Sequence, residues 1–136
     1  MKKILIVPFL VMLIALTGCQ SVEKNVDPEI KGIVNKISAE DAKKKMDEDK
    51  SIILVDVRTK EEYDEAHIEN AVLLTLDTIN AMAPSLIPDK NATYFVYCRS
   101  GSRSAIAASE LVIMGYMNIY DMGGIADWPY ETVQGK

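Results

Sequence analysis

Short apolar runs alternate with helix-like segments along most of this chain, and no other sequence feature restricts the possible fold as much. The apolar runs have the length and composition of strands and lie at residues 33–37, 52–55, 71–74, 94–97 and 118–120. The segments between them carry helical signals and lie at residues 38–46, around 63, 76–83 and 104–114. This alternation predicts an α/β fold, with a mainly parallel five-stranded central sheet and helices on both faces.

Local signals mark the ends of several predicted helices. Ser38 can cap the helix that follows it, and the segment Thr59 to Glu62 has the spacing of a capping box. A third helix is expected to reach Ala83, with Pro84 after it. Gly115 is suited to the position just past the end of the last helix, because this position often has a left-handed backbone.

Ligands of α/β folds bind beyond the carboxyl ends of the strands. Three places in this sequence qualify: Asp56 after the second strand, Cys98 after the fourth, and Gly123-Gly124 after the fifth. A solitary thiol at the end of a central strand, just before a helix, is where a nucleophile is expected.

The N-terminus has the pattern of an export signal. Lys2 and Lys3 precede an uncharged apolar run from Ile4 to Leu16. A membrane-spanning helix needs roughly 20 apolar residues, so this run is too short to span comfortably. Its length and basic flank are typical of a signal peptide, which we expect to occupy residues 1–18.

The end of this run, Leu16-Thr17-Gly18-Cys19, resembles the lipobox of bacterial lipoproteins. The resemblance implies that Cys19 is lipidated and becomes the mature N-terminus, which would hold the exported protein on the extracytoplasmic side of a bacterial membrane. Residues 19–32 would then be the lipidated cysteine and a flexible tether, because they are polar and lack apolar periodicity. The folded domain is expected at residues 33–136.

Charge and cysteine number exclude several classes of function. Residues 1–18 hold two of the 15 basic residues and none of the 20 acidic ones, so the mature chain has a net charge near −7. A domain this acidic is a poor nucleic-acid binder. Once lipid occupies Cys19, Cys98 is the only remaining thiol, which leaves no intramolecular disulfide and no zinc site of several cysteines.

The segment that follows Cys98 is suited to stabilising an anion. It consists of Arg99, Ser100, Gly101, Ser102 and Arg103. The small residues allow backbone N–H groups to turn inward at the start of a helix, where partial positive charge is concentrated. A thiolate placed there should have a lowered pKa, and the two arginines would attract an anionic substrate.

This chain resembles the rhodanese family over residues 33–130. The family's active-site loop often reads Cys-Arg-x-Gly-x-Arg, and the chain has this pattern from Cys98 to Arg103. Further family motifs appear in the same order as Asp56-Val57-Arg58, Glu62-Tyr63, Ala66-His67-Ile68, Asn70-Ala71, Gly123-Gly124 and Trp128. Two family glycines are replaced, by Ala66 and by Asn70, and asparagine tolerates a left-handed backbone better than most residues.

The resemblance implies a rhodanese-like fold and a sulfurtransferase. Cys98 would carry the transferred sulfur as a persulfide, taken from thiosulfate, a persulfide or a polysulfide and passed to cyanide or a thiol. The loop from Arg99 to Arg103 would bind the donor. Asp56, Arg58 and His67 are interpreted as structural support for the site. No metal or organic cofactor is expected, and the sequence favours a monomer.

Three other functions stay open. The chain could be a rhodanese-like binding module without turnover, or a persulfide or redox carrier whose acceptor is a protein at the membrane. It could also be a cysteine-dependent phosphatase or arsenate reductase. Those enzymes place an arginine six positions after the cysteine, whereas this chain has Ser104 there and Arg103 one position earlier. The shorter loop favours sulfur transfer.

Overall fold

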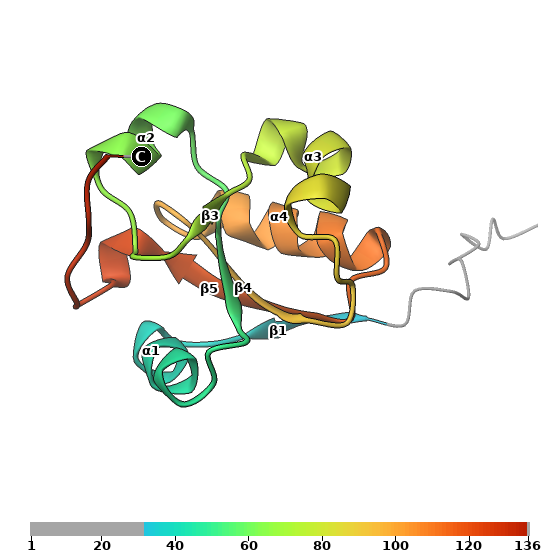
Figure 1. The fold of residues 1–136 in the computed structure, drawn as a ribbon, viewed down its shortest axis with the longest axis horizontal. Helices are drawn as coiled ribbons and strands as arrows, with labels where there is room; N and C mark the ends of the chain where they lie inside the picture. The colour runs from blue at the N-terminus through green and yellow to red at the C-terminus, as the bar shows by residue number, and fades with distance from the viewer. Residues whose placement is uncertain (1–31, 136) are drawn as a thin grey trace, which may run out of the picture.

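The computed structural model describes residues 32–135 (Figure 1). The strands are β1 (Ile33–Lys36), β2 (Ile53–Asp56), β3 (Val72–Leu73), β4 (Thr93–Cys98) and β5 (Asn118–Gly124). The helices are α1 (Ala39–Glu48), α2 (Lys60–Glu65), α3 (Ile79–Leu86) and α4 (Ser102–Ile113), with 3-10 turns η1 (Leu76–Thr78) and η2 (Ile125–Asp127).

The predictions for the N-terminus lie outside the described residues. These are the signal peptide at residues 1–18, the lipidation of Cys19 and all but the last residue of the tether at 19–32. Within residues 32–135, no helix is long and apolar enough to cross a membrane.

The five strands form one sheet in the order β1-β5-β4-β2-β3, and all of its ladders are parallel. This confirms the predicted five-stranded parallel sheet. Because the strands are parallel, the carboxyl ends of the three inner strands meet at one edge. Asp56 pairs there with Tyr97, and Cys98 pairs with Gly124.

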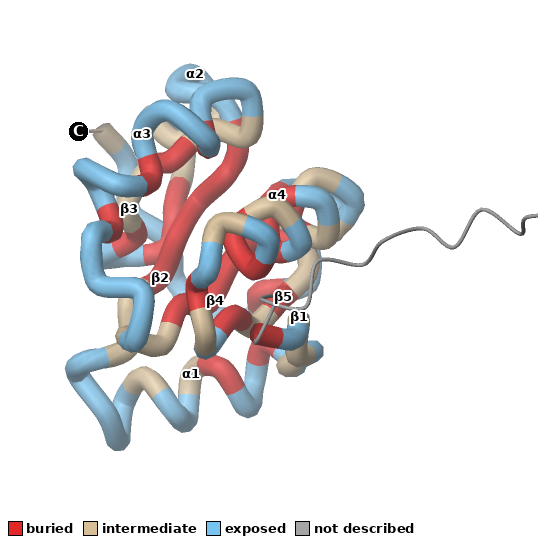
Figure 2. Tube along the Cα trace, turned by 90° about the vertical axis from the view of Figure 1, so that its right-hand side faces the viewer, coloured by how far each residue is buried: buried red, intermediate tan, exposed pale blue. Residues whose placement is uncertain are grey.

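Helices cover both faces of the sheet, as predicted. Helices α3 and α4 lie on one face, and α1 lies on the other (Figure 1). Strand β4 is buried in the middle of these layers (Figure 2). Its alternate side chains enter two separate cores: Tyr94, Val96 and Cys98 pack with α3 and α4, while Phe95 and Tyr97 pack with α1 and Trp128.

Three of the predicted helix boundaries are confirmed. The Ser38 hydroxyl accepts a hydrogen bond from the Asp41 N–H at 3.1 Å and caps α1. Thr59 and Glu62 form the reciprocal bonds of a capping box at the start of α2. Gly115 follows α4 with a φ of +96°, a left-handed conformation that favours glycine.

The predicted end of the third helix was wrong, because α3 continues through Pro84 to Leu86. Ile79, Ala83 and Ile87 are buried at a spacing of four residues, so apolar contacts hold the chain on both sides of the proline. Asn80, whose carbonyl loses its hydrogen bond to the proline position, is exposed to water.

Two other predicted boundaries also differ from the structure. Helix α4 begins at Ser102, two residues before the predicted start. Strand β5 continues to Gly124, so the glycine pair belongs to the strand. Both differences bring additional backbone to the edge of the sheet where Cys98 lies.

Candidate active site

Cys98 is the last residue of β4, and its side chain is fully buried. Only Arg99, Ser100 and Gly101 separate it from the first residue of α4. Gly101 is the N-cap of α4 and has a φ of +108°, which a residue with a Cβ atom rarely adopts. This glycine allows the chain to turn from strand to helix in so few residues, with the sulfur beside the helix N-terminus.

Hydrogen bonds favour the ionised form of the Cys98 thiol. Burial by itself raises the pKa of Cys98, but N–H groups of Ser104, Gly101 and Ser100 and the hydroxyl of Ser104 lower it, and the net shift is downward. The Gly101 N–H donates to the sulfur at 3.0 Å. The lowered pKa favours the thiolate relative to an unperturbed cysteine, which is the direction that the sequence predicted.

The end of β5 forms the floor beneath this loop. A Cβ atom added to Gly124 would lie 2.3 Å from the carbonyl oxygen of Arg99, so the two backbones are in direct contact. The N–H of Ala126 donates to the same oxygen at 3.2 Å. Gly124 therefore has a packing role, because any side chain at this residue would push against the loop.

A buried polar cluster fastens the first turn of α4 to this floor. The Ser104 hydroxyl lies 2.7 Å from Oδ1 of Asp121, and the Gly123 N–H donates to the same oxygen at 3.0 Å. Ser104 and Asp121 are both buried. Neither residue was among the site residues that the sequence predicted. Their sequence signals were a polar residue directly after the loop and an acid directly after the last predicted strand.

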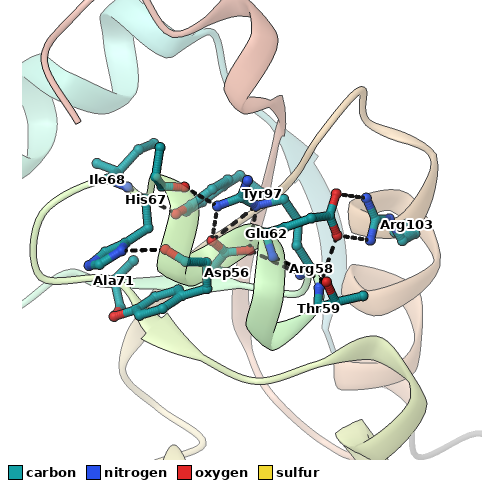
Figure 3. Close-up of polar contacts among 11 residues, drawn as sticks. Asp56, Arg58, Thr59, Glu62, His67, Ile68, Ala71, Tyr97 and Arg103 are labelled. Carbon is teal, nitrogen blue, oxygen red and sulfur yellow. Dashed lines mark hydrogen bonds and ion pairs between the residues drawn. The ribbon is translucent and has the colours of Figure 1, made fainter. Parts of the chain in front are cut away.

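The side chain of Arg103 reaches α2. Its guanidinium group donates two hydrogen bonds to the Glu62 carboxylate, at 2.7 and 2.8 Å (Figure 3). Glu62 also accepts the Thr59 N–H at 3.0 Å, so one carboxylate caps α2 and holds the loop arginine. The hydrogen bonds from Arg103 lower the pKa of Glu62 to about 2. Burial opposes this shift, and hydrogen bonds from Thr59 add to it.

The Glu62–Arg103 pair predicts a specific acid sensitivity. The pKa of Glu62 falls from 4.5 to about 2 on folding, so its contribution to stability is complete above 4.5 and is lost as the pH falls towards 2. The melting temperature of the wild-type protein should therefore fall more steeply over this range than that of Glu62→Gln. Glu61→Gln, which changes an exposed acid of the same helix, is the matched control and should keep the wild-type slope. Equal slopes for all three proteins would show that the pair contributes nothing in solution.

The predicted support residues form a second polar cluster beside the loop (Figure 3). Asp56 and Arg58 are buried and paired, with Nη2 of Arg58 2.7 Å from Oδ2 of Asp56. The same nitrogen donates to the carbonyl of Ala66 at 2.7 Å. His67 is also buried, and its ring stacks on Tyr63 with 3.7 Å between centroids.

These contacts place the support residues in the framework around the site. Nδ1 of His67 lies 2.8 Å from the carbonyl oxygen of Tyr63, and the backbone of His67 pairs with Val133 in both directions. Arg58 therefore binds the backbone that follows α2, whereas His67 contacts α2 itself and pairs with the C-terminal segment at Val133. Asn70, in the segment that follows α2, has a φ of +64°, the left-handed conformation that the sequence predicted asparagine would tolerate where the family has glycine.

The sequence and fold of this chain match a known family. The family model described as the rhodanese-like domain matches residues 38–130. The chain belongs to the rhodanese-like family. The matched range contains all five residues from Arg99 to Arg103, together with Cys98, Asp56, Arg58 and His67.

Individual relatives agree with this assignment to the rhodanese-like family. The thiosulfate sulfurtransferase PspE of Escherichia coli (strain K12) is 35% identical over 81 residues, which cover 60% of this chain and 78% of PspE. YrkF of Bacillus subtilis (strain 168) is 34% identical over 100 residues, or 73% of this chain, but the chain spans only 53% of YrkF. The crystal structure of a rhodanese-like domain protein from Staphylococcus aureus is 33% identical, covers 75% of this chain and 99% of that one, and has a TM-score of 0.67.

The rhodanese-like domain thus brings some predicted residues to the sulfur and leaves others apart. The loop from Arg99 to Gly101 surrounds Cys98, while Arg103 is turned towards Glu62. Within residues 32–135, no group of three or more His, Cys, Asp or Glu side chains is placed to hold a metal ion. The chemistry of the site centres on one activated thiol and the N–H groups around it.

Proposed function

We propose that this protein is a sulfurtransferase in which Cys98 carries a sulfane sulfur from a donor to a thiophilic acceptor. The donor is thiosulfate, a persulfide or a polysulfide, and the acceptor is cyanide or a thiol. The single observation that carries this proposal is the sulfur of Cys98, which lies in a ring of backbone N–H groups with its pKa lowered. The similarity to a thiosulfate sulfurtransferase supports it.

The reaction has two steps, each a substitution at sulfur. With thiosulfate, the Cys98 thiolate attacks the outer sulfur, and a bond forms between the two sulfur atoms. The bond from the outer sulfur to the sulfonate sulfur breaks, and sulfite leaves with the electron pair. Cyanide or a thiolate then attacks the terminal sulfur of the persulfide, and the Cys98 thiolate is regenerated.

The loop has the polarity that both steps need. The terminal sulfur of the persulfide is anionic, and the N–H groups around Cys98 stabilise negative charge as it moves outward. Among the residues that the structure describes, Arg99 is exposed and makes no ion pair, whereas the charge of Arg103 is already paired with Glu62. Arg99 is therefore the loop cation available to an anionic donor, and Arg103 acts by holding the loop.

The test is the intact mass of the purified protein after treatment with thiosulfate. The wild-type protein should gain the mass of one sulfur atom, and cyanide should remove it. Thiosulfate-dependent thiocyanate formation should greatly exceed hydrolysis of aryl phosphates. A folded protein that gains no sulfur from several donors would instead be a binding module, and one that loads but passes sulfur only to a protein thiol would be a carrier. Efficient phosphate hydrolysis without loading would favour a phosphatase.

We also propose that the protein is exported and anchored by lipid on Cys19. The support comes from Lys2, Lys3, the apolar run that follows them and the Leu16-Thr17-Gly18-Cys19 sequence. The mature protein should begin at an acylated Cys19 and partition with membranes. Cys19→Ala should block acylation and processing, which mass spectrometry of the membrane fraction would detect. A Cys19→Ala protein with the wild-type mass and membrane partition would contradict the lipid anchor.

A further inference from the structure

A cavity of about 1000 Å³ lies at the start of β2, and neither Cys98 nor its loop lines it. Its lining includes Ile53 and Leu54, the first two residues of β2. Ile53 packs against the core beneath α3 and α4, whereas Leu54 belongs to the core beneath α1. Because side chains from both faces of the sheet line the cavity, it lies at the edge of the strand.

The edge of β2 that faces β3 is not paired over its first two residues. The ladder between β2 and β3 starts at Val55 and Val72, whereas β2 pairs with β4 from Ile53 onwards. The N–H and C=O groups of alternate residues in a strand point to the same side. The Asp56 carbonyl accepts a hydrogen bond on the side of β3, so the Leu54 N–H points to that side as well.

The Leu54 N–H is therefore a donor at the edge of the sheet before β3 begins. No loop carbonyl within residues 32–135 accepts a hydrogen bond from it, although Leu54 is a buried residue. A buried N–H without an acceptor is unfavourable. A further strand beside the start of β2 would supply a carbonyl oxygen at this point.

Apolar side chains form the walls of this cavity on both faces of the sheet. Met46 of α1 and Trp128 line it from one face, and Leu86 of α3 lines it from the other. Helices α1 and α3 lie on opposite faces (Figure 1). Leu86 and Tyr130, which also lines the cavity, are 42% and 41% exposed. Successive side chains of an added strand would point to opposite faces and cover both walls.

The unpaired carboxylates that line the cavity favour a basic occupant. Lys43 pairs with Asp47 at 2.5 Å, and Lys50 lies 3.8 Å from the same carboxylate, so this group keeps one unbalanced positive charge. Glu69 and Glu131 are exposed and form no ion pair within residues 32–135, which leaves two negative charges. The lining is therefore acidic on balance.

We propose that this cavity is a docking site for an extended segment of a partner protein, apolar and basic in sequence, which adds a strand beside the start of β2. The segment accepts a hydrogen bond from the Leu54 N–H, and its lysine or arginine pairs with Glu69 or Glu131. The site lies at the amino end of the parallel sheet and Cys98 lies at the carboxyl end, so a docked partner does not cover the active-site loop. This inference goes beyond the proposed sulfur transfer and does not depend on it.

The first test is a titration of the full-length protein in detergent with a defined peptide, acetyl-Lys-Val-Thr-Val-Thr-Val-Lys-amide. Trp128 is the only tryptophan of the chain, so its fluorescence reports on the cavity. The basic peptide should bind, and an analogue with glutamate in place of both lysines should bind roughly two- to fivefold more weakly. Absence of binding, or equal binding of the two peptides, would overturn the inference.

Charge reversal on the rim locates the binding. Glu69→Lys and Glu131→Lys should each weaken binding of the basic peptide and strengthen binding of the acidic one. Glu61→Lys is the matched control, because it makes the same change of charge at an exposed acid that does not line the cavity. An equal loss of affinity in all three variants would mean that only the overall charge matters, which would overturn the site. If either rim variant fails to fold, the other decides.

Hydrogen exchange followed by NMR tests the strand pairing itself. The basic peptide should slow exchange of the Leu54 amide about five- to tenfold at saturation, because that N–H gains an acceptor. Protection of the amides of β1, the other outer strand, with none at Leu54 would contradict the proposed place of docking. Loading of Cys98 with sulfur should be the same with and without the peptide, so failure of docking leaves the proposed function intact.

Two other occupants are distinguished by the same measurements. Residues 20–31 of this chain contain three acidic and two basic residues, so they suit the acidic lining less well. If a synthetic peptide of residues 20–31 binds more tightly than the basic peptide, the occupant is this chain and the partner is rejected. Protection of the Leu54 amide that rises with protein concentration, without any peptide, would reject the partner in favour of a second copy of the chain.

Discussion

Cys98→Ser should take up no sulfur from thiosulfate, a persulfide or a polysulfide, and it should keep its fold. The loop stabilises a thiolate, and a serine hydroxyl has no comparable anion at neutral pH. The replacement is nearly isosteric, and its oxygen can accept the Gly101 N–H that the sulfur now accepts at 3.0 Å. Intact mass spectrometry checks the loading, and thermal unfolding checks the fold.

The matched control uses the only other cysteine of the chain. Cys19→Ala should gain one sulfur as readily as the wild type, and cyanide should remove it. If Cys98→Ser still loads, the sulfur is bound elsewhere and the catalytic assignment fails. If neither the wild type nor Cys19→Ala loads while both are folded, the protein is better described as a binding module.

The fold and the place of Cys98 could be predicted because both depend on local patterns. The apolar run Ile52–Val55 is long enough for a strand covered on both faces, and β2 lies there. The thiol could be placed at a carboxyl strand end because Tyr94–Tyr97 is apolar and a helix signal follows it. The capping signals at Ser38 and Thr59 were equally local, since each side chain binds backbone three residues away.

The partners of the loop could not be predicted, because they are distant in sequence. Glu62 is 41 residues from Arg103, and its sequence context indicated a capping box and a family motif but no contact with the loop. Asp121 is 17 residues from Ser104, and the two meet because β5 lies beside β4 in the sheet. The length of α3 was missed for a related reason, since tertiary contacts of Ile79 and Ile87 outweigh the local effect of Pro84.

Gly124→Ala should strongly impair sulfur loading by displacing the loop from its floor. The added Cβ would lie 2.3 Å from the Arg99 oxygen and 2.8 Å from the Ser100 Cα, and both are backbone atoms that no side-chain rotation can move aside. We expect a loss of about 1–3 kcal/mol in stability from overpacking. The loading rate should fall by roughly ten- to a hundredfold, because small displacements of reacting groups are costly. Stopped reactions analysed by mass spectrometry give the rate.

Gly123→Ala provides the comparison that separates displacement of the loop from loss of stability. A Cβ at this position meets nothing within 4 Å, but the φ of +83° makes alanine unfavourable by about 1–2 kcal/mol. The two variants should therefore lose similar stability, whereas only Gly124→Ala pushes on the backbone of Arg99. Loading that falls equally in both would mean that stability alone limits the reaction. A selective defect in Gly124→Ala would show that β5 sets the position of the loop, and with it the N–H groups that surround Cys98.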